Sequence, residues 1–208
     1  MKLKFGVTVV LLLLAAVPLA AQERNVQLTV FFSRAQMQGD NDFGDGFASE
    51  FDDGTGYGAS ANMFFGRYVS VEASVFSVRT EGALLLDSQP VFNLGNMNLT
   101  PISLGAQFHI LGDSRFDPYV GGGASYVMGD DLFTEDLDFA GVGRIELENE
   151  VAYYINAGVG VRISEGFGVV LDARQIQYEP SSRSSVTGVE QDLEITPRIL
   201  SAGLRLRF

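Results

Sequence analysis

The chain contains no cysteine, a single histidine and no long apolar run after its first 21 residues. The absence of cysteine excludes disulfide bonds, thiol catalysis and cysteine-ligated metal sites. A transmembrane helix needs about 20 consecutive apolar residues, so residues 22–208 offer no such helix. If this part of the chain enters a membrane, it does so as a closed β-barrel, because only helices and closed barrels satisfy their backbone hydrogen bonds in lipid.

The first 21 residues have the pattern of a cleavable export signal. Lys2 and Lys4 precede an apolar run over residues 7–14, and small residues follow up to Ala21. A positive start, a short apolar stretch and a small-residue cleavage site define a secretory signal peptide. The alternative, a helical membrane anchor, would need a longer run. We expect residues 1–21 to be a cleaved signal peptide and residues 22–208 to form one domain.

The net charge and the composition further limit the possible partners and the possible fold. The formal net charge is -12, and removal of Lys2 and Lys4 with the signal peptide makes it -14. Such acidity argues against a nucleic-acid partner, because nucleic-acid binding needs basic patches. The 24 glycines and 7 tyrosines suit strands and tight turns better than helices.

The last 13 residues, 196–208, read TPRILSAGLRLRF and alternate between apolar and polar positions from residue 200 onward. Successive side chains of a strand point to opposite faces, so Leu200, Leu204 and Phe208 share one face and Arg205 lies on the other. The alternative is the edge strand of a soluble sandwich. A strand with one apolar face that ends on an aromatic residue is, however, typical of the closing strand of an outer-membrane barrel.

Seven earlier segments alternate in the same way, which makes eight strand candidates: residues 26–37, 55–65, 69–79, 99–111, 118–128, 151–163, 167–178 and 196–208. The connections are alternately long (residues 38–54, 80–98, 129–150 and 179–195) and short (residues 66–68, 112–117 and 164–166). Outer-membrane barrels have long extracellular loops and short periplasmic turns. The sequence therefore predicts an all-β fold, an eight-stranded antiparallel up-and-down transmembrane β-barrel in the cell outer membrane.

Three stretches resemble the outer-membrane protein W family. The most specific is RFDPYVGGGASY at residues 115–126, within a longer likeness over residues 99–126 to the family's central hairpin. Residues 157–179, which end in LDARQIQYE, are similar to its sixth and seventh strands, and residues 195–208 to its closing strand. The resemblance implies an eight-stranded barrel with an apolar pocket, from which small hydrophobic molecules leave through a side opening. The family often carries tryptophan in these strands and this chain has none, so we expect no tryptophan gate.

The resemblance also implies a role for the closing strand in assembly. Leu204, Leu206 and Phe208 are the apolar positions at its end. In such a barrel they form the signal that the insertion machinery recognises. The expected partners are this barrel-insertion machinery, outer-membrane lipid and lipopolysaccharide.

The inward-facing positions predict a lumen in two parts. Near the periplasmic end, four charged residues are expected to form a plug of ion pairs: Glu72, Arg162, Asp172 and Arg205. Buried charges must be paired, and we expect Asp172 to pair with Arg205 on the neighbouring strand. Near the outer end, six inward residues form an apolar upper lumen: Phe31, Phe76, Val78, Tyr154, Ile176 and Ile199. Eight strands leave room for side chains or for one small ligand.

Catalytic and metal sites are not expected. His109 is the only histidine, and a catalytic role would need a nucleophile and an orienting partner within its reach. The acidic residues at 40–53 and 130–138 miss the spacing of a calcium-binding loop, and charge runs of this kind are usually solvated. We expect no enzyme activity, no metal and no cofactor.

Two functions stay open at this point. The first is a narrow channel or binding pocket for a small hydrophobic ligand, with lateral release where Pro180 and Pro197 weaken the pairing of the last two strands. For the two prolines the alternative is that they merely end their strands. The second function is a structural or adhesive barrel with a filled lumen, which acts through its acidic extracellular loops. An open upper lumen would favour the first function, and a filled one would favour the second.

Overall fold

A computed structural model describes residues 26–38, 41–44, 47–87, 89–112, 114–130, 145–178, 181–184, 190–192 and 195–208. The predicted signal peptide, residues 1–21, and Pro180 lie outside the described residues. Within the described ranges, no helix is long and apolar enough to cross a membrane.

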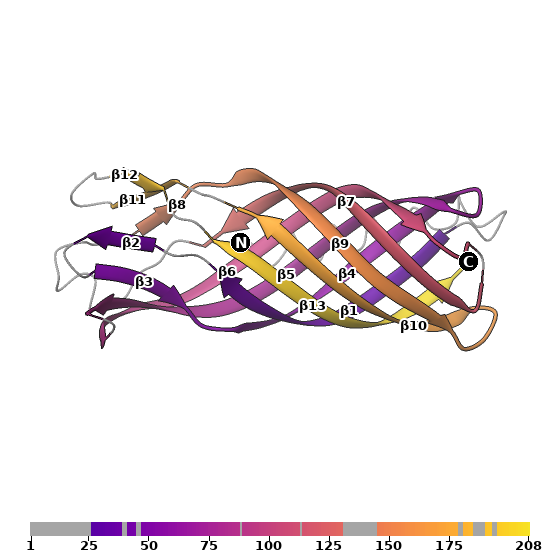
Figure 1. The fold of residues 1–208 in the computed structure, drawn as a ribbon, viewed down its shortest axis with the longest axis horizontal. Coiled ribbons are helices and arrows are strands. Elements are labelled where there is room, and N and C mark those ends of the chain that lie inside the picture. The colour runs from indigo at the N-terminus through magenta and orange to yellow at the C-terminus, as the bar shows by residue number, and fades with distance from the viewer. Residues whose placement is uncertain are drawn as a thin grey trace.

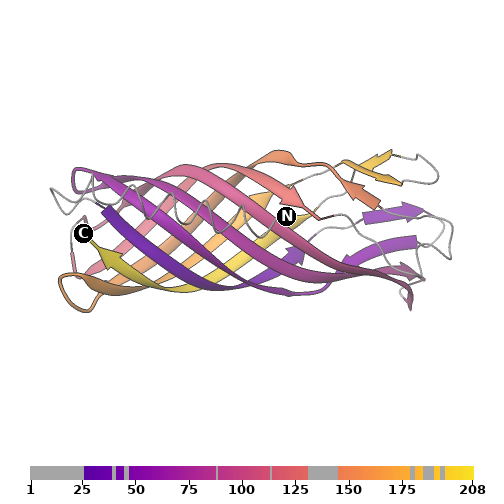
Figure 2. The same ribbon diagram turned by 180° about the vertical axis from the view of Figure 1, so that it is seen from behind.

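Eight long strands form one closed antiparallel barrel (Figure 1, Figure 2). They are β1 (Val26–Gln38), β4 (Gly54–Phe65), β5 (Val69–Leu86), β6 (Gln89–His109), β7 (Phe116–Gly129), β9 (Glu150–Arg162), β10 (Phe167–Gln177) and β13 (Thr196–Arg207). Each pairs with the next barrel strand along the chain, and β13 pairs with β1 to close the ring. The predicted eight-stranded up-and-down barrel is confirmed.

Five short strands lie beyond one end of the barrel, which we call the loop end. β2 (Asn41–Gly44) and β3 (Phe47–Phe51) form a hairpin, and β3 pairs with β5. β8 (Ile145–Leu147), β11 (Ser181–Ser184) and β12 (Glu190–Asp192) form a separate three-stranded sheet. The opposite end, the short-turn end, carries the C-terminus (Figure 1).

One predicted connection is instead an extended hairpin. The sequence predicts a loop over residues 80–98, but β5 continues to Leu86, β6 begins at Gln89, and the two strands pair through this region. Asp87 adopts a positive φ of 50° at the turn, and aspartate is one of the few residues that tolerate this region. Two register shifts interrupt the pairing beyond Gly82. They disturb the two-residue alternation that makes a strand visible in a sequence.

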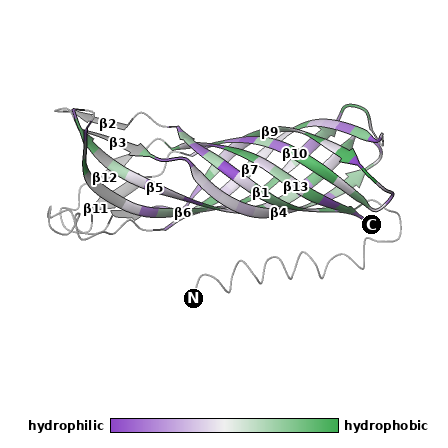
Figure 3. Cartoon of the chain, turned by 90° about the horizontal axis from the view of Figure 1, so that it is seen from below, coloured by the Kyte–Doolittle hydropathy of each residue, from purple (hydrophilic) through white to green (hydrophobic). Residues whose placement is uncertain are grey.

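The barrel wall follows the predicted alternation of faces. In β1, Phe31 and Ser33 are buried in the lumen, whereas Val30 and Phe32 are 59% and 68% exposed on the outer face. Hydrophobic and hydrophilic residues accordingly alternate along the barrel strands (Figure 3). Every barrel strand contributes large apolar side chains to the outer face. Such an apolar outer face is what a barrel in contact with lipid requires.

The closing strand ends against the first strand. Leu204, Leu206 and Phe208 lie on the outer face. The amide of Phe208 donates a hydrogen bond to the carbonyl oxygen of Val26 at 2.9 Å, which continues the pairing of β13 with β1. Recognition of this apolar face by the insertion machinery stays a prediction.

Candidate functional site in the barrel lumen

The lumen has three layers, which follow from the inward positions of the eight strands. A cavity opens at the short-turn end. Above it lies a buried polar layer, and the layer nearest the loop end is apolar. We describe the polar layer first, because it separates the other two.

Arg174 on β10 is the centre of the polar layer. Its side chain crosses the lumen and donates a hydrogen bond to a carboxylate oxygen of Glu72 on β5 at 2.5 Å and another to the Ser74 hydroxyl at 2.8 Å. A second carboxylate, from Asp172, lies 3.9 Å from Arg174 Nε. Glu72 and Arg174 are each only 2% exposed. We call Glu72, Asp172 and Arg174 the central cluster.

Two aromatic rings flank the same guanidinium. The Arg174 Cζ atom lies 4.9 Å from the centroid of the Phe76 ring and 4.4 Å from that of the Tyr154 ring. A cation held against an aromatic face is stabilised by the quadrupole of the ring, more so when water is excluded. The rings also form the floor of the apolar layer, so Arg174 marks the boundary between the polar and apolar parts of the lumen.

The carboxylates of the central cluster have further hydrogen-bond donors. Gln107 Nε2 donates to Glu72 at 2.7 Å, and Gln107 in turn accepts a hydrogen bond from Asn62. Tyr119 Oη and Asn156 Nδ2 donate to Asp172 at 2.8 and 3.0 Å. These donors stabilise two anions that are removed from water, which is the condition for burying a charge.

The structure corrects the predicted partners of the four-residue plug. Glu72 and Asp172 meet Arg174, which the prediction did not include. Arg205 lies beside Asp117 instead, with Nη1 3.8 Å from the carboxylate. Arg162 Nη2 donates to the carbonyl oxygen of Ser114 at 2.6 Å, near the short-turn end.

The expected pairing of Asp172 with Arg205 fails because of strand register. Opposite Asp172 on β13 is Ser201, and Arg205 is opposite Gly168. The two charged residues are therefore four positions apart, about 13 Å along the strand. The pair that does form joins β5 to β10 across the lumen, whereas the prediction compared only neighbouring strands.

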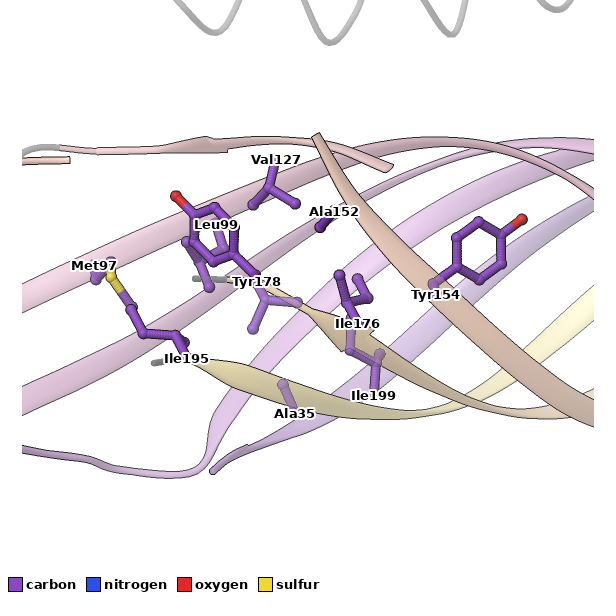
Figure 4. Close-up of a cluster of buried hydrophobic side chains, with 11 residues drawn as sticks. Ala35, Met97, Leu99, Val127, Ala152, Tyr154, Ile176, Tyr178, Ile195 and Ile199 are labelled. Carbon is purple, nitrogen blue, oxygen red and sulfur yellow. The ribbon is translucent and has the colours of Figure 1, made fainter. Parts of the chain in front are cut away.

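The apolar layer contains the six predicted residues in two groups. Val78, Tyr154, Ile176 and Ile199 belong to a cluster with seven other buried side chains: Ala35, Met97, Leu99, Val127, Ala152, Tyr178 and Ile195 (Figure 4). Phe31 and Phe76 form the second group, with Tyr119 and Val170. Ile176 and Ile199 are 0% and 1% exposed, so protein atoms fill the space around them.

Glycine makes room for the two phenylalanines in this narrow barrel. A Cβ atom on Gly58 would lie 2.5 Å from Cδ1 of Phe76, and one on Gly203 would lie 2.8 Å from Cδ1 of Phe31. No side chain fits at such distances, so both positions require glycine while the rings keep their places.

The ladder between β10 and β13 is interrupted beside the apolar layer. Gln175 pairs with Arg198, and Tyr178 pairs with Ile195 in the same register. The two positions between them, where Ile176 faces Pro197 and Gln177 faces Thr196, are not part of the ladder. Proline has no N–H to donate, which accounts for the interruption. We call these two unpaired positions the seam.

A chain of hydrogen bonds passes through His109 at the lower edge of the polar layer. His109 Nε2 lies 2.9 Å from the Ser70 hydroxyl, and Nδ1 lies 2.9 Å from a carboxylate oxygen of Asp117. A serine, a histidine and an aspartate in this order are the groups of a hydrolase triad. The sequence analysis did not predict this arrangement, because Ser70, His109 and Asp117 lie on three different strands, β5, β6 and β7.

Catalysis by this chain of residues would require that a substrate can reach Ser70. Ser70 and His109 are both 0% exposed, and neither lines the cavity at the short-turn end. A substrate carbonyl must come within about 3 Å of the nucleophile and of oxyanion donors, and the packed surroundings of Ser70 leave no such position. Among the described residues, no group of three or more acidic or histidine side chains is arranged to hold a metal ion.

Comparisons with known proteins agree with the fold. A family model described as an outer membrane protein beta-barrel domain matches residues 7–208. The chain is 28% identical over 118 residues to an uncharacterized outer-membrane protein, y4mB, of Sinorhizobium fredii. This match covers 55% of the chain, and the chain spans only half of the relative's length.

Two solved structures share the barrel. The outer membrane protein OprG of Pseudomonas aeruginosa superposes with a TM-score of 0.73 at 18% identity, over 88% of this chain and 95% of OprG. The outer membrane protein AlkL, solved in lipid bilayers, gives a TM-score of 0.64 at 18% identity, over 88% of this chain and 90% of AlkL. At these identities the likeness concerns the fold.

The central cluster makes a prediction about stability. Replacing Glu72 with alanine should lower the free energy of unfolding by about 3–5 kcal/mol, because Arg174 would keep a buried charge without its main partner. The matched control is Asp53→Ala, which breaks an exposed ion pair in which Arg34 Nη2 lies 2.8 Å from Asp53 Oδ2. This change should lower the free energy of unfolding by about 0–1 kcal/mol. Denaturant unfolding followed by heat-modifiable gel mobility measures both. Equal, small losses would mean that Glu72 is in contact with bulk water.

Proposed function

The chain belongs to the outer-membrane β-barrel family and is an OmpW-like barrel of the outer membrane, and from this premise we propose that it carries small hydrophobic molecules sideways into the membrane. Outer-membrane barrels have their short turns in the periplasm and their long loops outside the cell. The short-turn end of this barrel would therefore face the periplasm, and its loop end would face outward. The observation that supports the proposal is the position of the seam, directly beside the apolar layer and above a charged floor.

The central cluster argues against an axial path. A molecule that moved straight down the lumen would have to displace Arg174 from Glu72 and from the two rings beside it. Removing one partner of a buried ion pair costs about 3–5 kcal/mol, and an apolar solute offers nothing in return. The straight path toward the short-turn end is therefore unfavourable for a hydrophobic ligand in the upper lumen, which favours a lateral exit.

The seam is a weak point in the described wall of the apolar layer. Ile176 belongs to the apolar cluster and faces Pro197 across the interruption. Beyond the seam a single bridge holds the strands, with the amide of Ile195 donating to the carbonyl oxygen of Tyr178 at 3.0 Å. Opening here would break that one hydrogen bond. The β5–β6 ladder has a similar two-position gap opposite Pro101, between the pairs Val75–Ile102 and Val78–Leu99.

The proposed path is closed in this conformation. Ile176, Ile199, Met97 and Tyr178 are at most 1% exposed, so ligand entry requires these side chains to move apart. The conduit is thus gated, with the apolar cluster as its gate.

The same close packing favours a second candidate. A barrel whose lumen is filled throughout its apolar layer suits a structural or adhesive role, with function in the extracellular loops and lipopolysaccharide among its partners. Most of the predicted acidic loop residues lie outside the described residues, and the choice between the two candidates depends on transport measurements.

A disulfide across the seam tests the lateral exit. The chain has no cysteine, so Gln177→Cys combined with Thr196→Cys introduces one defined pair at the unpaired position. The oxidised variant should lose uptake of a small apolar dye that fluoresces in lipid, and reduction should restore it. The matched control is Ala173→Cys with Leu200→Cys, a pair in the continuous part of the same ladder, which should leave uptake unchanged.

Two results would contradict the proposal at different levels. Equal uptake by the oxidised and reduced seam variants would exclude an exit at this position. Equal uptake by cells with and without the protein would exclude the conduit altogether and would leave the filled structural or adhesive barrel as the better interpretation.

The triad-like chain is proposed to be structural and not catalytic. Ser70, His109 and Asp117 satisfy one another's hydrogen bonds inside a barrel that buries the serine completely. A fluorophosphonate probe, which labels activated serines, should react with the folded wild-type protein no more than with Ser70→Ala. Labelling of the wild type that Ser70→Ala abolishes would establish a reactive nucleophile and overturn this assignment.

A further inference from the structure

Positive charge is distributed very unevenly in this acidic protein. Lys2 and Lys4 are the only lysines among 14 Lys and Arg residues, so the 12 Lys and Arg side chains after residue 21 are all arginines. Five of these 12 arginines line a single cavity of about 280 Å³ at the periplasmic mouth: Arg67, Arg115, Arg162, Arg205 and Arg207. Asp117 and Glu165 are the carboxylates in the described lining. The described lining of the cavity is cationic, although the whole chain is strongly anionic.

Hydrogen bonds fix two of the guanidinium groups at the rim. Arg162 Nη2 donates to the carbonyl oxygen of Ser114 at 2.6 Å, and Arg115 Nε donates to the carbonyl oxygen of Arg162 at 3.2 Å. Both bonds join the turn before β7 to the end of β9. The donors therefore hold their positions around the cavity without a ligand, which lowers the entropy cost of binding.

Arg205 forms the inner wall of the cavity. Its side chain is 10% exposed, and its nearest carboxylate contact is Asp117 at 3.8 Å from Nη1. Nε reaches the Thr29 hydroxyl at 3.4 Å. Asp117 also accepts a hydrogen bond from His109 in the tautomer that protonates Nδ1. One carboxylate is thus shared between two partners, and its contact with Arg205 is long.

Gly160 preserves the space that this guanidinium occupies. A Cβ atom at position 160 would lie 2.8 Å from Arg205 Nη1. The guanidinium therefore lies against bare backbone on the cavity wall. Gln27 also lines the cavity, and its buried Oε1 atom has no hydrogen-bond partner.

We propose that this cavity binds a phosphate group. Arginine presents several N–H donors in a planar fork that matches the oxygens of phosphate and carboxylate. Among the described lining residues, the five guanidinium groups outnumber the two carboxylates by three charges, which suits a phosphate of up to two negative charges better than a single carboxylate. The site is independent of the lateral conduit, because the central cluster separates the two.

Two sources of phosphate reach the periplasmic mouth. One is the headgroup of a phospholipid in the inner leaflet, next to the rim. The other is a soluble phosphate ester in the periplasm. Both present the same chemistry to the arginines, and titration with matched probes distinguishes them.

The experiment uses the folded protein in a maltoside detergent, which contains no phosphate, at constant ionic strength set with chloride. Amide NMR shifts of Gly160 and Gly168 report on the cavity during titration with inorganic phosphate, glycerol 3-phosphate and a short-chain phosphatidylglycerol. Saturable shifts of these amides are expected with at least one probe. Saturation by either soluble probe identifies a soluble ligand, and saturation by phosphatidylglycerol alone identifies a headgroup.

Variants at the exposed rim keep the test clear of folding defects. Arg67→Gln combined with Arg115→Gln should weaken binding about tenfold, since each exposed charge contact contributes modestly. The matched control is Arg79→Gln, which removes an exposed arginine bonded to Asn96 far from this cavity and should leave affinity unchanged. Absence of saturable shifts with all three probes would overturn the proposal. Equal affinity in the rim variant and the control would overturn it as well.

Discussion

The interior of this barrel depends on how one buried guanidinium is held. Arg174 crosses the lumen to Glu72 at 2.5 Å and lies between the rings of Phe76 and Tyr154. A charge in a packed interior is tolerated only when ion pairs and hydrogen bonds replace its water. Glu72 and Asp172 have their own donors in Gln107, Tyr119 and Asn156, although Asp172 Oδ1 and Arg174 Nε are buried without a hydrogen-bond partner.

The layers of the lumen follow from this arrangement. Arg174 separates an arginine-lined mouth at the short-turn end from an apolar cluster near the loop end that packs to almost zero exposure. Eight strands leave no space for a water channel beside these side chains. The protein therefore presents two separate environments, one open to the periplasm and one bounded by the wall at the seam, where Pro197 interrupts the β10–β13 ladder. Because the central cluster separates these two environments, transport of a hydrophobic solute and binding of a phosphate can be tested independently.

Strand alternation made the barrel and its two faces predictable from sequence. Val30 and Phe32 outside, and Phe31 and Ser33 inside, follow directly from the period of two. The pairing of Arg174 with Glu72 did not follow, since strand tilt and stagger set the heights of residues on opposite walls, and neither is visible in a single segment. The same limit hid the proximity of Ser70, His109 and Asp117. The extension of β5 and β6 was missed because register shifts disturb its alternation.

Planar-bilayer conductance of the purified, folded protein tests most directly whether Arg174 and its partners close the lumen. If the central cluster and the apolar layer fill the barrel, the protein should carry no steady ionic current above that of the bare bilayer. Regular single-channel current steps from the wild-type protein would show a continuous water path past Arg174 and would contradict a closed lumen.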